Sequence, residues 1–255
     1  MLPVCADVLF DRIVTLYKNA AMNEICRSSS FLTGLLAAIL VMSLSSAANS
    51  ADSTATAIPE NADTLVRKLD ETRYAIGNLI IDKSRGTIDA PGRINMNRGL
   101  IEYLAVTSYG KTHEATFILD IQPLHLQVAL LLLGLDYGRN LDCQGDTTRP
   151  AGDSVAIYIK WANSEGDSSH YSASELILDY RTDTTLPETR WVFTGSRVHE
   201  GYFLADDDGS IIATYNDPMA ILNNPRPERI DDTILGSNHF LLPEIGTKIV
   251  MVIAK

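Results

Sequence analysis

His113 and Glu114 are adjacent in the sequence, and their side-chain types suit acid–base chemistry. A histidine beside a carboxylate can transfer a proton near neutral pH, and both side chains can also bind metal ions. The pair is not part of an H-E-x-x-H zinc motif, because Phe117 occupies the position of the second histidine. We therefore treat His113 and Glu114 as candidate binding residues. The alternative is a structural pair that satisfies hydrogen bonds of neighbouring loops.

Three consecutive aspartates followed by Gly209 are the second candidate binding site, and Asp206 and Asp208 are its candidate binding residues. Carboxylate oxygens are the hard ligands that Ca²⁺ prefers. An EF-hand loop would need Asp or Asn at its first position and Glu at its twelfth, where this chain has Leu204 and Tyr215. The alternative is a β-turn, in which Asp and Gly tolerate left-handed backbone geometry.

Other side chains of catalytic type lack the partners that catalysis needs. Ser196 is not in the G-x-S-x-G setting of a nucleophile elbow, because strand-like sequence follows it. Cys143 is the single cysteine after residue 51, so it cannot form an internal disulfide or a thiolate metal site. The remaining histidines, without ligand spacing, are His125, His170, His199 and His239. The sequence therefore predicts no catalytic residue and no cofactor, and it leaves metal binding open.

The N-terminal region has the features of a secretory signal. Phe31 to Met42 is an uncharged apolar run that follows an arginine and precedes several small residues. We assign residues 1–51 to a signal region, with Met22 as an alternative start, and expect a secreted or periplasmic protein. An uncleaved membrane anchor is the alternative, although the run is shorter than the roughly 20 residues that a membrane span needs. Residues 52–73 are expected to be a flexible lead-in.

The charge balance excludes one class of partner. The chain has 21 Lys and Arg residues against 32 Asp and Glu residues, which gives a net charge of −11. Such a surface repels phosphate backbones and anionic lipid headgroups, and no basic run offsets it. We expect no nucleic-acid partner, and a membrane contact only if the signal segment is uncleaved. The expected partner is an unidentified protein or small molecule.

The elements that would position these side chains include one prominent helix. A predicted strand, Ala115 to Ile121, leads into a predicted helix, Pro123 to Leu133. Proline suits the first helical position, and Gly134 suits the left-handed residue that ends a helix. Only His125 and Gln127 are polar after the proline, and a helix that is apolar on nearly every side is a buried one. We therefore predict a central core helix.

Short apolar runs separated by turn residues predict strands over most of the remaining chain. Leu100 to Ser108 precedes a hairpin-like loop, so we expect it to pair antiparallel with Ala115 to Ile121. Pro91-Gly92 predicts a turn. Ser154 to Ala162 alternates strictly, with Val155, Ile157, Ile159 and Trp161 on one face. The predicted class is α+β, predominantly antiparallel β, with one buried central helix and one or two short helices.

Several short motifs follow one another at set intervals along the chain. They are Arg93-Ile94-Asn95-Met96, Gly99 to Tyr103, Gly110 to Glu114, Pro123 to Leu135, Trp191 to Ser196, Asp206 to Gly209, and Pro243 to Thr247. In their order and spacing they resemble the YdjY-type domain of bacterial secreted and envelope proteins. The resemblance covers residues 74–254 and implies one globular domain, residues 74–255, outside the cytoplasm. That family has no assigned activity, so the resemblance implies no catalytic residues.

Three functional hypotheses remain open at this stage. The first is a non-catalytic module of the cell envelope that binds a ligand or partner. The second is a metal-assisted, hydrolase-like enzyme, which requires His113 and Glu114 to converge with the aspartate run in a cleft. The third is a structural envelope protein that the uncleaved apolar run holds in the membrane.

Overall fold

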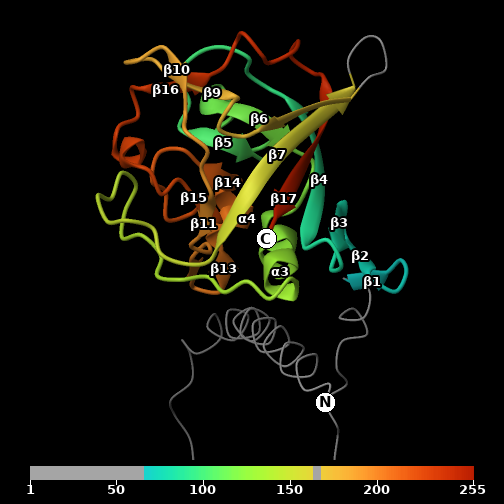
Figure 1. Cartoon of the computed structure of the whole chain (residues 1–255). Helices are drawn as coiled ribbons and strands as arrows, with labels where there is room; N and C mark the ends of the chain where they lie inside the picture. Colours follow the sequence, from blue (N-terminus) through green and yellow to red (C-terminus); the bar gives the residue numbers. More distant parts are fainter. Residues whose placement is uncertain (1–65, 163–167) are drawn as a thin grey trace, which may run out of the picture.

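The computed structural model describes residues 66–162 and 168–255, and its centre is a closed β-barrel (Figure 1). Eight strands form the barrel, and its last strand returns to pair with the first. In order around the barrel they are β4 (Thr87–Ile94), β17 (Lys248–Ala254), β7 (Ser154–Ala162), β11 (Trp191–Phe193), β15 (Leu222–Asn223), β14 (Ser210–Ala213), β5 (Tyr103–Val106) and β6 (Ala115–Leu119). Closure satisfies both edges of the sheet, so no edge of the barrel is left unpaired where β4 and β6 meet.

The barrel closes because β4 changes partner halfway along its length. Residues 87–89 pair with β3 (Leu79–Asp82), and residues 92–94 pair with β6. Pro91-Gly92 lies between these two halves inside one continuous strand, so the turn predicted there is wrong. The carbonyl of Pro91 accepts a hydrogen bond from the backbone N of Asp120 at 2.9 Å, and its missing N–H falls at the change of partner. Proline is tolerated at such a break in the ladder.

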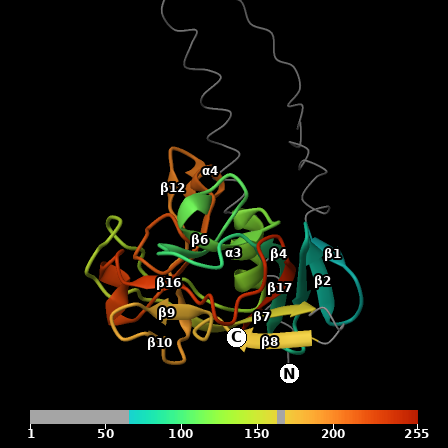
Figure 2. The same ribbon diagram turned by 90° about the horizontal axis from the view of Figure 1, so that it is seen from above.

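The remaining strands extend the barrel or lie beside it (Figure 2). Strands β1 (Val66–Lys68) and β2 (Arg73–Ile76) continue the sheet beyond β3, and β8 (Ser168–Ser172) pairs with β7. A separate three-stranded sheet consists of β9 (Ile177–Asp179), β10 (Thr184–Thr185) and β16 (Leu235–Ser237). Strands β12 (Val198–His199) and β13 (Tyr202–Phe203) form a two-stranded hairpin. The small sheet and the β1–β2 extension lie on opposite sides of the barrel in both views.

The predicted fold class is wrong, because the protein is mostly β and its described residues contain a closed barrel without a central core helix. Helix α3 (Pro123–Leu132) covers one end of the barrel, at the bottom in Figure 1, where it packs against α4 (Leu204–Asp208) and β3. Leu126 and Leu130 are buried, whereas Leu131 and Leu132 are partly exposed. A helix with apolar side chains on every side must be shielded from water, and packing against the end of a barrel shields it sufficiently. Within the described ranges, no helix has both the length and the apolarity that a membrane crossing requires.

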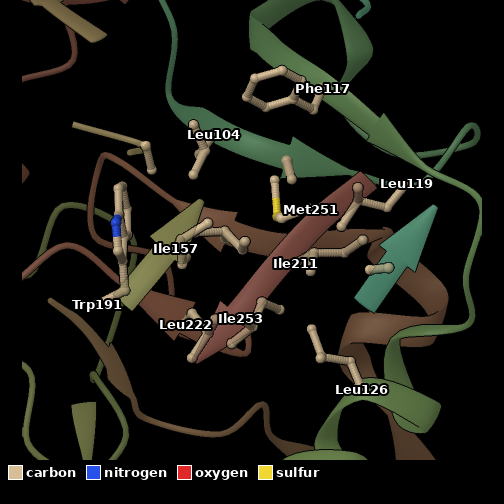
Figure 3. Packing of buried hydrophobic residues seen from close by; sticks show 14 of the residues in the cluster. Leu104, Phe117, Leu119, Leu126, Ile157, Trp191, Ile211, Leu222, Met251 and Ile253 are labelled. Atoms are coloured by element: carbon tan, nitrogen blue, oxygen red, sulfur yellow. The ribbon is translucent and has the colours of Figure 1, made fainter. Parts of the chain in front are cut away.

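The core lies inside the barrel, where strand side chains meet (Figure 3). The predicted alternation of β7 is confirmed, since Val155, Ile157, Ile159 and Trp161 are all buried. Figure 3 shows Leu126 of α3 at the edge of a group of strand residues that includes Met251 and Ile253. Each such side chain contributes about 1.5–3 kcal/mol on full burial.

Strands β5 and β6 run parallel, so the antiparallel pairing predicted for this segment is wrong. Tyr103 pairs with Ala115, the first residue of each strand. The backbone N of Glu102 donates to the carbonyl of Glu114 at 3.0 Å, so the chain has already returned to the start of β5 before β6 begins. The 3₁₀ turn η1 (Thr112–Glu114) completes this return.

Candidate functional site

His113 lies at the protein surface, and Glu114 beside it is partly buried. They belong to η1, just before β6, and the side chain of His113 is 79% exposed. Its Nε2 atom lies 3.6 Å from Oε2 of Glu114. An exposed histidine with one carboxylate neighbour has no second group to orient it for acid–base catalysis.

Asp206 and Asp208 belong to the short helix α4, where a β-turn was the structural alternative. The helix ends at Gly209, which has a left-handed φ of 76°. Oδ1 of Asp206 accepts a hydrogen bond from the backbone N of Leu124 at 2.9 Å, so this carboxylate binds the first turn of α3. Burial raises the pKa of Asp206. Asp208 accepts a hydrogen bond from the hydroxyl of Ser210.

A polar cluster around Tyr103 connects the segment before η1 with the end of α4. The Tyr103 hydroxyl donates to Oδ2 of Asp217 and accepts from Nζ of Lys111, each at 2.7 Å. Lys111 Nζ also lies 3.5 Å from Oδ2 of Asp208. Burial is the main cause that raises the pKa of the Tyr103 phenol, and the charge of Asp217 adds to it. The phenol therefore stays protonated, and the cluster holds three segments together.

The binding role predicted for His113, Glu114, Asp206 and Asp208 stays a prediction. Among the described residues, no hydrogen bond or ion pair joins His113 or Glu114 to either aspartate, and Lys111 is the residue that reaches Asp208. Across residues 66–162 and 168–255, no group of three His, Cys, Asp or Glu side chains is placed to hold a metal ion. The described residues therefore offer no three-ligand metal cluster to support the metal-assisted hydrolase hypothesis.

A cleft of about 660 Å³ lies elsewhere, on the outer face of the barrel. We call it the arginine cleft, and its lining residues are Arg149, Pro150, Gly152, Ser154, Glu188, Thr189, Arg190, Val192, Pro225, Arg226, Pro227 and Arg229. Strand β11 provides its floor. Trp191 and Phe193 point into the barrel core, and Val192 between them faces the opposite way, into the cleft.

Two of the arginines are held by neutral partners. Nη2 of Arg190 donates to the carbonyl of Ser154 at 2.7 Å, and its Nε donates to the Ser154 hydroxyl at 3.2 Å. Nη2 of Arg229 donates to the carbonyl of Thr147 at 2.7 Å, and Nη1 donates to the carbonyl of Arg226 at 3.0 Å. These contacts orient both guanidinium groups, and neither group forms an ion pair with an acidic side chain of the described residues.

The other two arginines differ from each other. Arg226 Nε forms an ion pair with Oε2 of Glu228 at 3.2 Å, without hydrogen-bond geometry. Arg149 is exposed and has no hydrogen bond or ion pair to another described residue. Glu188 is the acidic residue that lines the cleft. The cleft is therefore locally positive in a chain whose net charge is −11.

Comparison with protein-family models matches residues 79–254 to the YdjY domain. The chain belongs to the YdjY family. The match extends from β3 to β17, so the whole barrel and the arginine cleft lie within the YdjY domain. The function of the YdjY domain is unassigned. Searches of curated proteins and of solved structures found no match to this chain.

The arginine cleft was not predicted from the sequence. Its arginines come from three separate segments between residues 149 and 229, and none belongs to a basic run. The one local signal is that Arg149 precedes Pro150 and Arg226 lies between two prolines. Such pairs indicate extended backbone and do not by themselves indicate binding.

Proposed function

We propose that this YdjY protein is a secreted or periplasmic ligand-binding domain whose ligand occupies the arginine cleft. The observation that carries the proposal is the cleft itself. Its volume of about 660 Å³ is in the range of about 300–1,000 Å³ that is typical of small-molecule sites. Its floor is a barrel strand, which gives the site a rigid base.

The chemistry of the lining supports binding over catalysis. Arginine stays protonated at all ordinary pH values, so it supplies charge and hydrogen-bond donors and does not act as a general base. Glu188 is the one carboxylate among the lining side chains, and neither histidine nor cysteine lines the cleft. The lining therefore provides recognition groups without a nucleophile and base pair.

The proposed location rests on the apolar run of residues 31–42 and the small residues after it. Cells that express the full chain would be fractionated, and the N-terminus of the protein would be read by mass spectrometry. We expect the soluble periplasmic or secreted fraction to contain protein cleaved after Ala48 or Ala51. Full-length protein in the membrane pellet would contradict this location and favour the anchored alternative.

The binding role is tested by NMR on purified, ¹⁵N-labelled exported protein. Three probes of similar size would be titrated separately: isophthalate, which is a dianion, neutral isophthalamide and cationic benzamidine. We expect at least one probe to shift the backbone amides of Gly152 and Val192, with the amide of Arg98, which lies outside the cleft, as a reference. If no probe shifts the cleft amides, the proposal is wrong.

A further inference from the structure

We infer that the ligand of the arginine cleft is a small organic anion with at least two acidic groups, carboxylate or phosphate. This inference rests on the proposed function and names its ligand class. It goes against the net charge of −11, which taken alone predicts that anions are repelled.

The local charge of the cleft favours an anion. Glu228 compensates Arg226, and Glu188 compensates one further charge at most. Arg149, Arg190 and Arg229 therefore carry more positive charge than the cleft itself balances. Because the net positive charge exceeds one, a ligand with one acidic group would leave part of it uncompensated.

The orientation of two guanidinium groups favours oxyanions. Each guanidinium has five N–H donors in a planar fork, and this fork matches the paired oxygens of carboxylate and phosphate. Arg190 already uses Nε and Nη2 on Ser154, and Arg229 uses Nε, Nη1 and Nη2 on carbonyls of Thr148, Arg226 and Thr147. A ligand therefore meets the N–H donors that these contacts leave over, chiefly Nη1 of Arg190. Because both groups are already held in place, binding need not order them again. Fixed donors reduce the entropy that a ligand must overcome when it binds.

The size and lining of the cleft favour an organic body over a bare inorganic ion. At about 30 Å³ per molecule, the cleft has room for roughly twenty waters, far more than one phosphate ion displaces. Val192 and the prolines Pro150, Pro225 and Pro227 provide apolar surface next to the charges. An apolar or aromatic body between two acidic groups would contact both kinds of surface.

The test compares dissociation constants of probes that share one body and differ in charge. Isophthalate, benzoate and isophthalamide form the series from dianion to neutral molecule. Pyrophosphate and inorganic phosphate, which have no apolar body, form the phosphate arm. We expect isophthalate to bind tightest, with affinity that falls as the salt concentration rises.

Arg149→Gln is the diagnostic variant, because Arg149 is exposed and has no described partner whose loss would unfold the protein. We expect it to weaken isophthalate binding by about threefold to tenfold, the effect of one charge-assisted contact, and to leave isophthalamide unaffected. Arg98→Gln is the matched control, since Arg98 is also exposed and unpaired among the described residues but lies outside the cleft. Glu188→Gln is expected to tighten isophthalate binding.

Each contrary result has one meaning. If isophthalamide binds the cleft as tightly as isophthalate, the anion inference is wrong and the binding function stands. If inorganic phosphate binds as tightly as isophthalate, the inference that the ligand has an organic body is wrong. Pyrophosphate tighter than isophthalate would likewise overturn the organic body and leave only the requirement for two acidic groups. Equal losses of isophthalate affinity in Arg149→Gln and Arg98→Gln would show that the anion does not bind in the arginine cleft. If no probe binds in the cleft, both the binding function and the anion inference are wrong.

Discussion

Gly92 pairs with Leu119 where β4 meets β6 and the barrel closes. A Cβ atom on residue 92 would lie 2.4 Å from the carbonyl oxygen of Ile118 and 2.8 Å from Cδ2 of Leu119. No real Cβ atom approaches a backbone oxygen so closely, so the two strands meet at this point because residue 92 has no side chain.

Gly92→Ala is therefore expected to lower the free energy of unfolding by about 2–3 kcal/mol, because the added methyl group overpacks the closure. Urea denaturation of the purified protein would measure it. Gly246→Ala is the control: residue 246 has a φ of 88° but open space around it, so it reports backbone strain without a clash. Equal destabilisation by the two changes would show that the closure is not sterically tight.

Tyr103→Phe removes the hydroxyl that donates to the buried carboxylate of Asp217. We expect a loss of about 1.5–3 kcal/mol in unfolding free energy, because the hydrogen bond is to a charged group and its loss leaves Oδ2 under-satisfied. Thermal and urea denaturation would measure it. Tyr137→Phe is the matched control, since Tyr137 is half exposed and its hydroxyl has no described partner. A loss no larger than that of the control would contradict the structural role of the Tyr103 cluster.

Asp179 gives the protein a pH-dependent contribution to stability. The Arg181 guanidinium donates to its carboxylate at 2.5 and 3.0 Å, and this hydrogen bonding lowers the pKa of Asp179 below its ordinary value. A lowered folded-state pKa means that the stabilisation is present above the unfolded-state pKa of about 3.9. It is lost as the pH falls through the folded-state value.

Asp179→Asn should therefore reduce stability near pH 7 by about 1 kcal/mol or less, since Arg181 is half exposed and solvent screens the pair. The difference between variant and parent should shrink as the pH falls below about 4. Denaturant unfolding at a series of pH values would measure it. Asp183→Asn, at an exposed aspartate in the next turn, is the control. A difference that stays constant with pH would show that the Asp179 charge is not the cause.

Local sequence predicted local structure well. The strand at Ser154–Ala162 has the predicted bounds, and its apolar face is the buried one. The helix begins at Pro123 as predicted, and Gly134 after it has the expected left-handed φ, 75°. These features depend on side-chain period and on the conformational limits of proline and glycine, which act within a few residues.

Sequence reasoning failed where the outcome depended on which segments meet. Pro91-Gly92 is a turn in most contexts, but here the strand continues because β3 and β6 each need half of its edge. The leucines of α3 must be buried, but their pattern does not show whether the helix lies at the centre of a core or at the end of a barrel. The parallel pairing of β5 and β6 likewise depends on the path between them.

The sequence by itself determined the YdjY family and the strand-rich composition, because both reside in residue order and local period. The tertiary structure alone decided the barrel closure and the parallel pairing of β5 with β6. It also decided the meeting of Arg149, Arg190 and Arg229 in one cleft. Net charge is a sum over the whole chain, whereas a binding site depends on the charges that folding brings within a few ångströms of one another.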